Sequence, residues 1–570
     1  MKRKPLRILF VVIFILLTIP TVCLAAEVDV GYINANKYKL LTLIPPAVAI
    51  ILAFLTKNVI VSLFIGIISG SLLLTIPGNN ILSGLILAFV DVINRMVESL
   101  ADPWNAGIIL QVLAIGGLIN LVTKMGGAKA IAESLSKRAK TRKSSQIITW
   151  LSGLIIFFDD YANAMIVGTM MRSITDKMRI SREKLAFIVD ATAAPVAGIA
   201  VISTWIGMEL GLIKDAFNTI GVSADAFGVF IQTIPYRFYN ILILFFIVIS
   251  ALLLKDFGPM RKSELKARKE GILTDDLNIE NTDSEEDIRY LAKKGIKPSM
   301  SNAIIPIGVL IFVALISFYF SGYSNIVNGD NQELISLLKS SPISFLAIRE
   351  AFSASDASVA LFQSSLLAGI VAIIMAVAKK IFTLSEAIEV WMEGLKRLLI
   401  TCVILVCAWS LSSVIKELGT AKYLITLLSD TIPAFLLPSI IFVLGSIISF
   451  ATGTSYGTMG ILMPLAIPLA YSINPEMSYI IVVTSAVLTG AIFGDHCSPI
   501  SDTTILSSMG AGCNHINHVK TQMPYALFTA AITILFGYIP VGLGMPIYLG
   551  LPLAMLALFI GLQIIGKKVE

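Results

Sequence analysis

The sequence predicts an all-α polytopic membrane protein built from inverted-topology repeats, with two re-entrant hairpins and broken transmembrane helices. Three observations support this fold class. Hydrophobic residues make up 56% of the 570 residues and charged residues 14%, with a mean hydropathy of +0.86, which is far from the composition of a soluble domain. Basic residues gather in short loops between apolar runs, as the positive-inside rule describes. A motif of the first half also recurs in the second half.

The N-terminus has a basic start, an apolar core and small residues at Cys23, Leu24 and Ala25. This order is typical of a signal peptide. Residues 1–25 are therefore expected to be a signal-like segment or, alternatively, a first transmembrane helix. In either case residues 27–36 should lie outside the cell.

The N-terminal transmembrane half is expected over residues 38–254. Its basic segments 124–143 and 172–184 should both be cytoplasmic. The 28 residues between them, "SSQIITWLSGLIIFFDDYANAMIVGTMM", are too few for two spans of about 20 residues each. They predict a re-entrant hairpin that turns at "DDYAN", which requires burial in protein or a wet cavity. A full crossing is doubtful only over residues 81–104, which carry Asp91, Arg95 and Glu98.

Residues 255–300 contain ten basic and ten acidic residues and no apolar period. They are expected to form a weakly ordered cytoplasmic linker. The C-terminal transmembrane half follows over residues 301–566. It contains a second hairpin, broken at "ATGTSYGT", whose flanks are not basic, so this hairpin should enter from outside.

The two halves share a motif. "PVAGIAVISTWIG" begins at Pro195 and "PISDTTILSSMG" begins at Pro499, each with a Ser eight positions later and a closing Gly. Both prolines are expected to break their helices at the site and to free backbone carbonyls. Because the two copies have opposite expected orientations, they predict an inverted repeat, the architecture of secondary transporters. The first copy has Gly198 where the second has Asp502, so the asymmetric charge lies in the second half.

Polar residues interrupt the apolar runs in three clusters. Ionisable groups at bilayer depth are costly and mark functional sites. Carboxylates, hydroxyls and freed carbonyls are hard oxygen ligands that suit a small hard cation, and no Lys or Arg lies within the clusters to bind an anion. The predicted cation- and proton-binding residues are Asp159, Asp160, Asn163, Thr452, Thr454, Ser455, Asp495, His496, Ser498, Asp502 and Thr503.

Structural alternatives remain open for each cluster. The aspartates can cap helices at a membrane interface, and the hydroxyls of the second cluster can pack helices together. His496 can be a hydrogen-bonded residue or a proton carrier. "GTSYG" matches the nucleophile elbow of hydrolases but lacks its strand–turn–helix context.

No resident metal or cofactor is expected. Cys513, His515 and His518 offer a zinc set, but a solvated or pH-sensing loop is favoured there. The five cysteines show no disulfide spacing and are expected to be free thiols. The formal net charge of +6 reflects the loops and does not indicate nucleic-acid binding.

The stretches "FFDDYANAMIVGT", "DATAAPVAGIAVISTWIG", "ATGTSYGTMGILMPL" and "GAIFGDHCSPISDTTILSSMGAG" resemble the NhaC family of Na+/H+ antiporters, over roughly residues 40–566. The resemblance implies a transporter and not an enzyme, exchanging Na+ for H+ across the cytoplasmic membrane of a prokaryote. Similar sequences include exchangers that couple Na+ and H+ to malate, lactate or amino acids, so a coupled carrier of a small organic solute is the alternative.

Exchange of this kind can result when Na+ and a proton exclude each other from one binding site. A carboxylate that binds either Na+ or a proton makes the two ions compete, provided that burial brings its pKa toward the working pH. Asp502 and Asp160 are the first choices for this role. The expected partners are membrane lipid and the two transported ions, and a homo-oligomer is left open.

Overall fold

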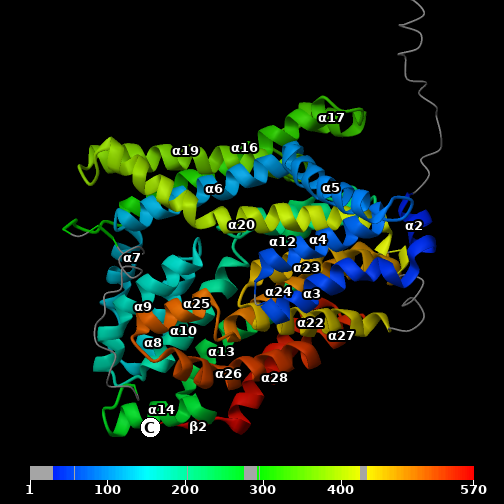
Figure 1. Ribbon diagram of the computed structural model, residues 1–570. Helices are drawn as coiled ribbons and strands as arrows, with labels where there is room; N and C mark the ends of the chain where they lie inside the picture. Colours follow the sequence, from blue (N-terminus) through cyan, green and yellow to red (C-terminus); the bar gives the residue numbers. More distant parts are fainter. Residues whose placement is uncertain are drawn as a thin grey trace, which may run out of the picture.

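The computed structural model describes residues 30–56, 58–201, 203–274, 292–293, 295–420, 422–423 and 433–569 (Figure 1). The signal-like segment 1–25, residues 275–291 of the expected linker and the flank at Asp430 lie outside the described residues. Within them the chain is almost entirely helical. Two strands of two residues each, β1 (Lys255–Asp256) and β2 (Lys567–Lys568), pair in antiparallel fashion.

The described part contains ten helical segments that are long and apolar enough to cross a membrane. One further span results if two helices bent by 44°, over Ala226–Tyr236 and Phe238–Leu253, are joined. The chain is therefore an all-α, multi-pass membrane protein, as predicted.

The first half holds a helical hairpin followed by an interrupted helix. Its elements are α2 (Val30–Tyr38), η1 (Lys39–Leu43), α3 (Ile44–Thr56), α4 (Val59–Thr75), α5 (Ile81–Ala101), α6 (Pro103–Lys124), α7 (Gly127–Ser136), α8 (Arg142–Ile155), α9 (Asp160–Lys177), α10 (Arg182–Ala197), α11 (Ile206–Thr219), α12 (Ala226–Thr233), η2 (Ile234–Tyr236) and α13 (Phe238–Leu253).

The second half repeats this order. Its elements, after α14 (Gly258–Lys269), are α16 (Ser301–Val327), α17 (Gln332–Ser340), α18 (Phe345–Ser353), α19 (Ala357–Ala378), α20 (Leu384–Leu418), η3 (Ala434–Leu436), α22 (Leu437–Thr452), α23 (Ser455–Ile473), α24 (Met477–Cys497), α25 (Asp502–Ala511), α26 (His515–Ile532), η4 (Thr533–Tyr538), α27 (Ile539–Gly542) and α28 (Ile547–Ile565).

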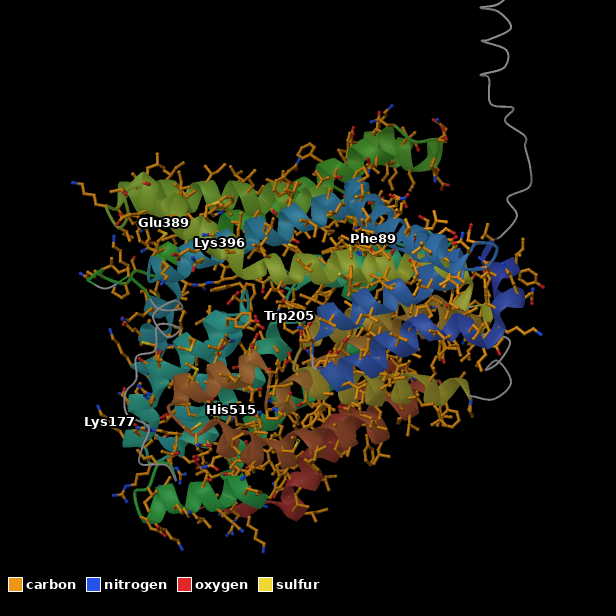
Figure 2. The ribbon with its side chains drawn as sticks, in the orientation of Figure 1. Phe89, Lys177, Trp205, Glu389, Lys396 and His515 are labelled. Carbon is orange, nitrogen blue, oxygen red and sulfur yellow. The ribbon has the colours of Figure 1, made fainter. Side chains whose placement is uncertain are left out.

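The two hairpins lie toward opposite ends of the molecule. Helices α8 and α9 occupy the left end in Figure 1, whereas α22 lies toward the right end, near α27. The basic segment that contains Lys177 lies at the left edge (Figure 2), together with α7 and α14, while α2 and α17 lie at the right. The basic segments 124–143 and 172–184 and the start of the expected linker therefore share one end, and the hairpins have the opposite orientations of an inverted repeat.

Helices α6, α16, α19 and α20 form a layer beside this repeat. In Figure 1, α16, α19 and α6 lie along one side, and α20 runs between them and the hairpins. Helix α20 is 35 residues long and begins with a capping box in which Thr383 and Glu386 satisfy each other's backbone groups. The layer thus faces the hairpins through one continuous helix.

Most of the doubtful region 81–104 forms a continuous 21-residue helix, α5, which is not among the ten candidate spans of the described chain. Two of its three charged residues, Asp91 and Arg95, are paired. The buried Arg95 guanidinium donates to Asp91 at 2.8 Å, to the hydroxyl of Ser413 at 2.8 Å and to the carboxylate of Glu417. These contacts attach α5 to α20 and explain how a charged helix fits against an apolar bundle.

The beginning of the expected linker is folded, which the sequence did not predict. Arg142 pairs with Glu264 at 2.5 Å, and Lys184 pairs with Asp256 at 2.7 Å, with all four side chains buried. The Tyr525 hydroxyl also donates to Asp256 at 2.6 Å. The charges that made this segment look like a solvated linker instead bind it to the N-terminal ends of α8 and α10 and to the middle of α26.

Candidate functional site

Both hairpins turn inside the protein, and each turn places a helix N-terminus there. In the first, the Asp159 carboxylate accepts a hydrogen bond from the Ala162 N–H at 2.6 Å and caps α9. In the second, α22 ends at Thr452 with Gly453 as its C-cap, and α23 begins at Ser455. Gly453 has φ +68° and an added Cβ would lie 2.7 Å from the Ile500 carbonyl oxygen, so glycine is required by both conformation and space.

Two interrupted helices, α10–α11 and α24–α25, accompany these turns. Helix α10 ends at Ala197 and α11 begins at Ile206, whereas α24 ends at Cys497 and α25 begins at Asp502. Pro499 lies within its break. Pro195, in contrast, lies inside α10, so this helix ends two residues after the proline and not at it.

Side-chain hydrogen bonds stabilise both breaks. The Arg237 guanidinium donates to the Gly198 carbonyl, and the Asn240 amide donates to the Pro195 carbonyl at 2.9 Å. In the second half, the Ser498 hydroxyl donates to the Phe450 carbonyl at 2.8 Å and ties the break to the hairpin. Such partners are what allow irregular backbone at membrane depth.

A small cavity of about 40 Å³ lies where the N-termini of α9, α23 and α25 meet. The four sets of groups that line it are carboxylates, hydroxyls, aromatic rings and one glycine. They are Asp160, Asp495 and Asp502; Thr454, Ser455, Ser501 and Thr503; Tyr161, Trp205 and Tyr456; and Gly453. Trp205 lies at the centre of the molecule (Figure 2) and stacks near Tyr456, with ring centroids 4.8 Å apart. The cavity is large enough for a cation with water.

Two of the carboxylates are well placed to bind a cation. The Ser455 hydroxyl donates to Asp495 at 2.8 Å. Asp160 is 3% exposed, and its Oδ1 atom has no hydrogen-bond partner among the described residues. An acceptor left unpaired at this depth is costly, so Asp160 is poised to bind an ion or a proton. Helix N-termini around the cavity help to stabilise its negative charges.

A cation here would be held by a mixed set of oxygens. In the part of the chain that the structure describes, no three His, Cys, Asp or Glu side chains converge closely enough to hold a metal ion. The lining of the small cavity offers carboxylate and hydroxyl oxygens to a cation. This mixed oxygen set suits a hard, weakly held monovalent cation better than a tightly chelated divalent metal.

A larger cavity of about 460 Å³ adjoins the small one. The two share Tyr161, Thr454, Tyr456 and Asp502 as lining residues. The larger cavity runs between α9 and α25 on one side and α6 and α20 on the other, and it reaches Thr123, beside the basic segment 124–143. It thus extends from the candidate site toward the end of the molecule expected to be cytoplasmic.

Arg397 lines this larger cavity together with Asp159 and Asp502. No Lys or Arg lies within the three sequence clusters, but the structure brings Arg397 to the cavity beside them. Arg397 belongs to α20, 105 positions before Asp502 in the sequence. Only the packing of the long helix against the hairpins brings the guanidinium to the cavity.

The structure brings together seven of the eleven predicted residues. Asp159, Asp160, Thr454, Ser455, Asp495, Asp502 and Thr503 line one cavity or both. Asn163, Thr452, His496 and Ser498 line neither. The Thr452 hydroxyl donates to the Ile448 carbonyl of its own helix at 2.9 Å, and the His496 ring faces the Tyr239 hydroxyl at 2.7 Å.

Asn163 holds the first hairpin together. Its amide donates to the carbonyls of Gly153 and Thr192, both at 2.8 Å, and thereby connects α8, α9 and α10.

We expect Asn163→Leu to lower the free energy of unfolding by about 2–4 kcal/mol, because two buried carbonyls would each lose a donor. Thermal unfolding in detergent micelles measures this loss. An unchanged melting temperature combined with a loss of transport would instead indicate a direct role in ion binding.

The structure assembles neither the hydrolase site suggested by "GTSYG" nor the zinc set of Cys513, His515 and His518. The Ser455 hydroxyl bonds to Asp495, while His496 bonds to Tyr239, so the two do not form a nucleophile–base pair. His515 contacts the Pro499 carbonyl at 2.7 Å, and His518 contacts Asp190 at 3.1 Å. The four cysteines of the described chain, Cys402, Cys407, Cys497 and Cys513, are free and buried, as predicted.

Sequence reasoning missed the aromatic wall of the site and Ser501. Tyr161 and Tyr456 occupy equivalent places in the two hairpins, each being the second residue of its helix. A comparison of "DDYAN" with "TSYGT" would have revealed them, because each stretch has a polar pair, a Tyr, a small residue and a polar residue. Trp205 has no such signal.

Comparisons with known proteins agree with this architecture. Residues 196–543 match the model of the Na+/H+ antiporter family. An uncharacterized protein of Haemophilus influenzae is 33% identical over 502 residues, covering 88% of this chain and 90% of the relative. The malate-2H(+)/Na(+)-lactate antiporter of Bacillus subtilis is 34% identical over 108 residues, covering 18% of this chain and 22% of that protein.

Among solved structures, the YdaH transporter of Alcanivorax borkumensis aligns with a TM-score of 0.47 and 13% identity, covering 82% of this chain and 90% of that one. This likeness is too weak to assign the topology. The family match extends over more than half of the chain and contains the second hairpin and both halves of α24–α25. The chain belongs to the Na+/H+ antiporter family.

Proposed function

We propose that this protein exchanges Na+ for H+ by alternating access across the cytoplasmic membrane of a prokaryote, with Na+ bound in the small cavity. The observation that carries the proposal is the buried Asp160 carboxylate, which lines a cavity with Asp495 and whose Oδ1 atom has no hydrogen-bond partner in the described part of the chain. The two ions are the cargo, and the transport cycle needs no resident cofactor.

The arrangement of the cavities gives the ion a path. The larger cavity leads from the small one toward the basic end of the molecule, so Na+ would reach Asp160 and Asp495 from the cytoplasm in this conformation. Trp205 and Tyr456 form an aromatic wall of the small cavity. Movement of the hairpins against the layer of α6 and α20 would then expose the ion to the other side, as in transporters with inverted repeats.

A Na+- and H+-coupled exchanger of a small organic anion is a second candidate. It is favoured by Arg397, whose guanidinium suits a carboxylate, and by the volume of the 460 Å³ cavity, which a bare Na+ ion does not need. In this version the small cavity still binds Na+, while the organic anion occupies the larger one.

Purified protein in sealed vesicles distinguishes the two candidates. A Na+ pulse outside vesicles that contain a pH-sensitive dye should move protons without any added solute, and a reversed Na+ gradient should reverse the dye signal. Proton movement only when a malate- or lactate-like anion is added would replace simple exchange by the coupled version. Flux that does not saturate with Na+ would contradict both candidates and indicate a channel.

A further inference from the structure

A second polar cluster lies buried outside both cavities, between α10, α13, α24 and α26. Its members are Asp190, Tyr239, His496, His518 and Gln522, and each is at most 1% exposed. Asp190 and Tyr239 come from the first half of the chain and the other three from the second half. None of the five lines the cavities assigned to Na+.

The cluster is joined by four short contacts. Asp190 Oδ2 lies 3.1 Å from His518 Nε2 and accepts a hydrogen bond from Gln522 Nε2 at 3.0 Å. Gln522 Nε2 also donates to the His496 carbonyl at 2.7 Å, and the His496 Nδ1 atom lies 2.7 Å from the Tyr239 hydroxyl. The cluster is therefore one connected network and reaches the residue next to Asp495.

Four polar atoms of this network have no hydrogen-bond partner within the described chain. They are Asp190 Oδ1, His496 Nε2, His518 Nδ1 and Gln522 Oε1. Each buried polar atom without a partner costs about 1–3 kcal/mol, and native proteins contain few of them. Water and an exchangeable proton are small enough to satisfy the four atoms of this network.

The chemistry of the network suits a proton better than a metal cation. Two of its four open atoms are imidazole nitrogens, which can take up a proton and are poor ligands for Na+. Since a carboxylate oxygen can only accept, neutral His518 carries its hydrogen on Nε2 and directs it at Asp190. Its Nδ1 atom is then the basic one, and it is the atom that is left open.

The electrostatic surroundings of Asp190 are set by a few groups. The titratable side chains that face it are Tyr239 from α13, Asp495, His496 and Cys497 from α24, and Cys513 and His518 at the start of α26. None of these is a Lys or Arg. One added proton therefore changes the Asp190–His518 pair from a net charge of −1 to 0.

We propose that the Asp190–His518 pair is the proton-carrying site of the exchanger, separate from the carboxylates that bind Na+. The proton adds to His518 Nδ1, giving an imidazolium paired with the Asp190 carboxylate. Na+ beside Asp495 disfavours this added positive charge by electrostatic repulsion, because Asp495 and Asp190 interact electrostatically. The inference rests on the proposed exchange of Na+ for H+.

The test compares two modes of transport in reconstituted vesicles. Exchange of radiolabelled Na+ for unlabelled Na+ needs only the Na+ site, whereas Na+-driven proton movement needs both sites. His518→Gln keeps an amide donor for Asp190 but has no basic nitrogen, and Asp190→Asn removes the carboxylate. We expect both variants to lower Na+-driven proton flux about 10-fold or more, and to leave Na+/Na+ exchange within about two-fold of the wild type.

Asp330→Asn, in the loop before α17, is the matched control, because Asp330 is exposed and lies far from either site in sequence. Melting temperatures in detergent establish that the variants are folded. Normal proton flux in a folded His518→Gln variant would overturn the inference. So would an equal loss of both modes, because this pattern indicates a structural role. Absence of both modes in the wild type would overturn the proposed function itself.

Discussion

Asp160→Asn is expected to abolish Na+/Na+ exchange and Na+-driven proton flux together, each by about 100-fold or more, equivalent to about 2.8 kcal/mol. Asp160 is buried, lines the small cavity and keeps one carboxylate oxygen without a partner in the described chain. An amide of the same size retains a carbonyl oxygen but loses the negative charge. A monovalent cation that leaves water needs this charge, since a neutral oxygen set repays too little of its hydration.

Measuring both Na+/Na+ exchange and Na+-driven proton flux distinguishes a Na+-site residue from a proton-site residue. A Na+-site residue should affect both modes, whereas the proton-site variants at Asp190 and His518 should affect only one. Asp495→Asn should behave like Asp160→Asn, because Asp495 lines the same cavity and is bound by Ser455. Asp330→Asn again serves as the control. Normal Na+/Na+ exchange in a folded Asp160→Asn protein would remove Asp160 from the Na+ site.

The fold was predictable because polar residues are conspicuous in an apolar sequence. Asp159 and Asp160 mark the turn of the first hairpin, and the flanking basic segments require both of its ends to lie on one side. Asp495 and Asp502 mark the interruption between α24 and α25 in the same way. The cost of burying charge is large enough that sequence alone reveals these positions.

The register of the repeat was less well predicted. Aligning Pro195 with Pro499 places Gly198 opposite Asp502. In the structure, Asp502 is the first residue of α25, and the first residue of α11 is Ile206. Trp205, just before α11, therefore takes the place of Ser501 and closes the cavity with its ring. An aromatic residue in an apolar run carries no signal of this role.

Two other features could not be read from the sequence, for a common reason. Arg397 and the charged residues of 255–269 look like cytoplasmic residues, because basic and acidic side chains normally face water. Arg397 reaches the larger cavity only through the packing of α20, and Asp256 and Glu264 are buried only because Lys184 and Arg142 pair with them. Such pairings depend on tertiary structure.

The buried Arg237 is the strongest candidate for a purely structural charge. Its guanidinium pairs with Glu209 at 2.7 Å, bonds to the Thr233 hydroxyl at 3.1 Å and donates to the Gly198 carbonyl. Arg237 and Glu209 are both fully buried. We expect Arg237→Gln to lower the free energy of unfolding by about 3–5 kcal/mol, because Glu209 would be left as an unpaired buried charge. Thermal unfolding in detergent micelles gives the measurement.

A double variant separates the loss of the ion pair from the loss of packing. In Glu209→Gln/Arg237→Gln no charge remains buried, so its stability should recover part of the loss seen in Arg237→Gln. Arg349→Gln is the matched control, since Arg349 and Glu350 pair at the surface, where such pairs contribute at most about 1 kcal/mol. If the double variant is no more stable than Arg237→Gln, the essential contacts of Arg237 are those with the Gly198 carbonyl and the Thr233 hydroxyl. The break between α10 and α11 would then depend on these hydrogen bonds and not on the ion pair.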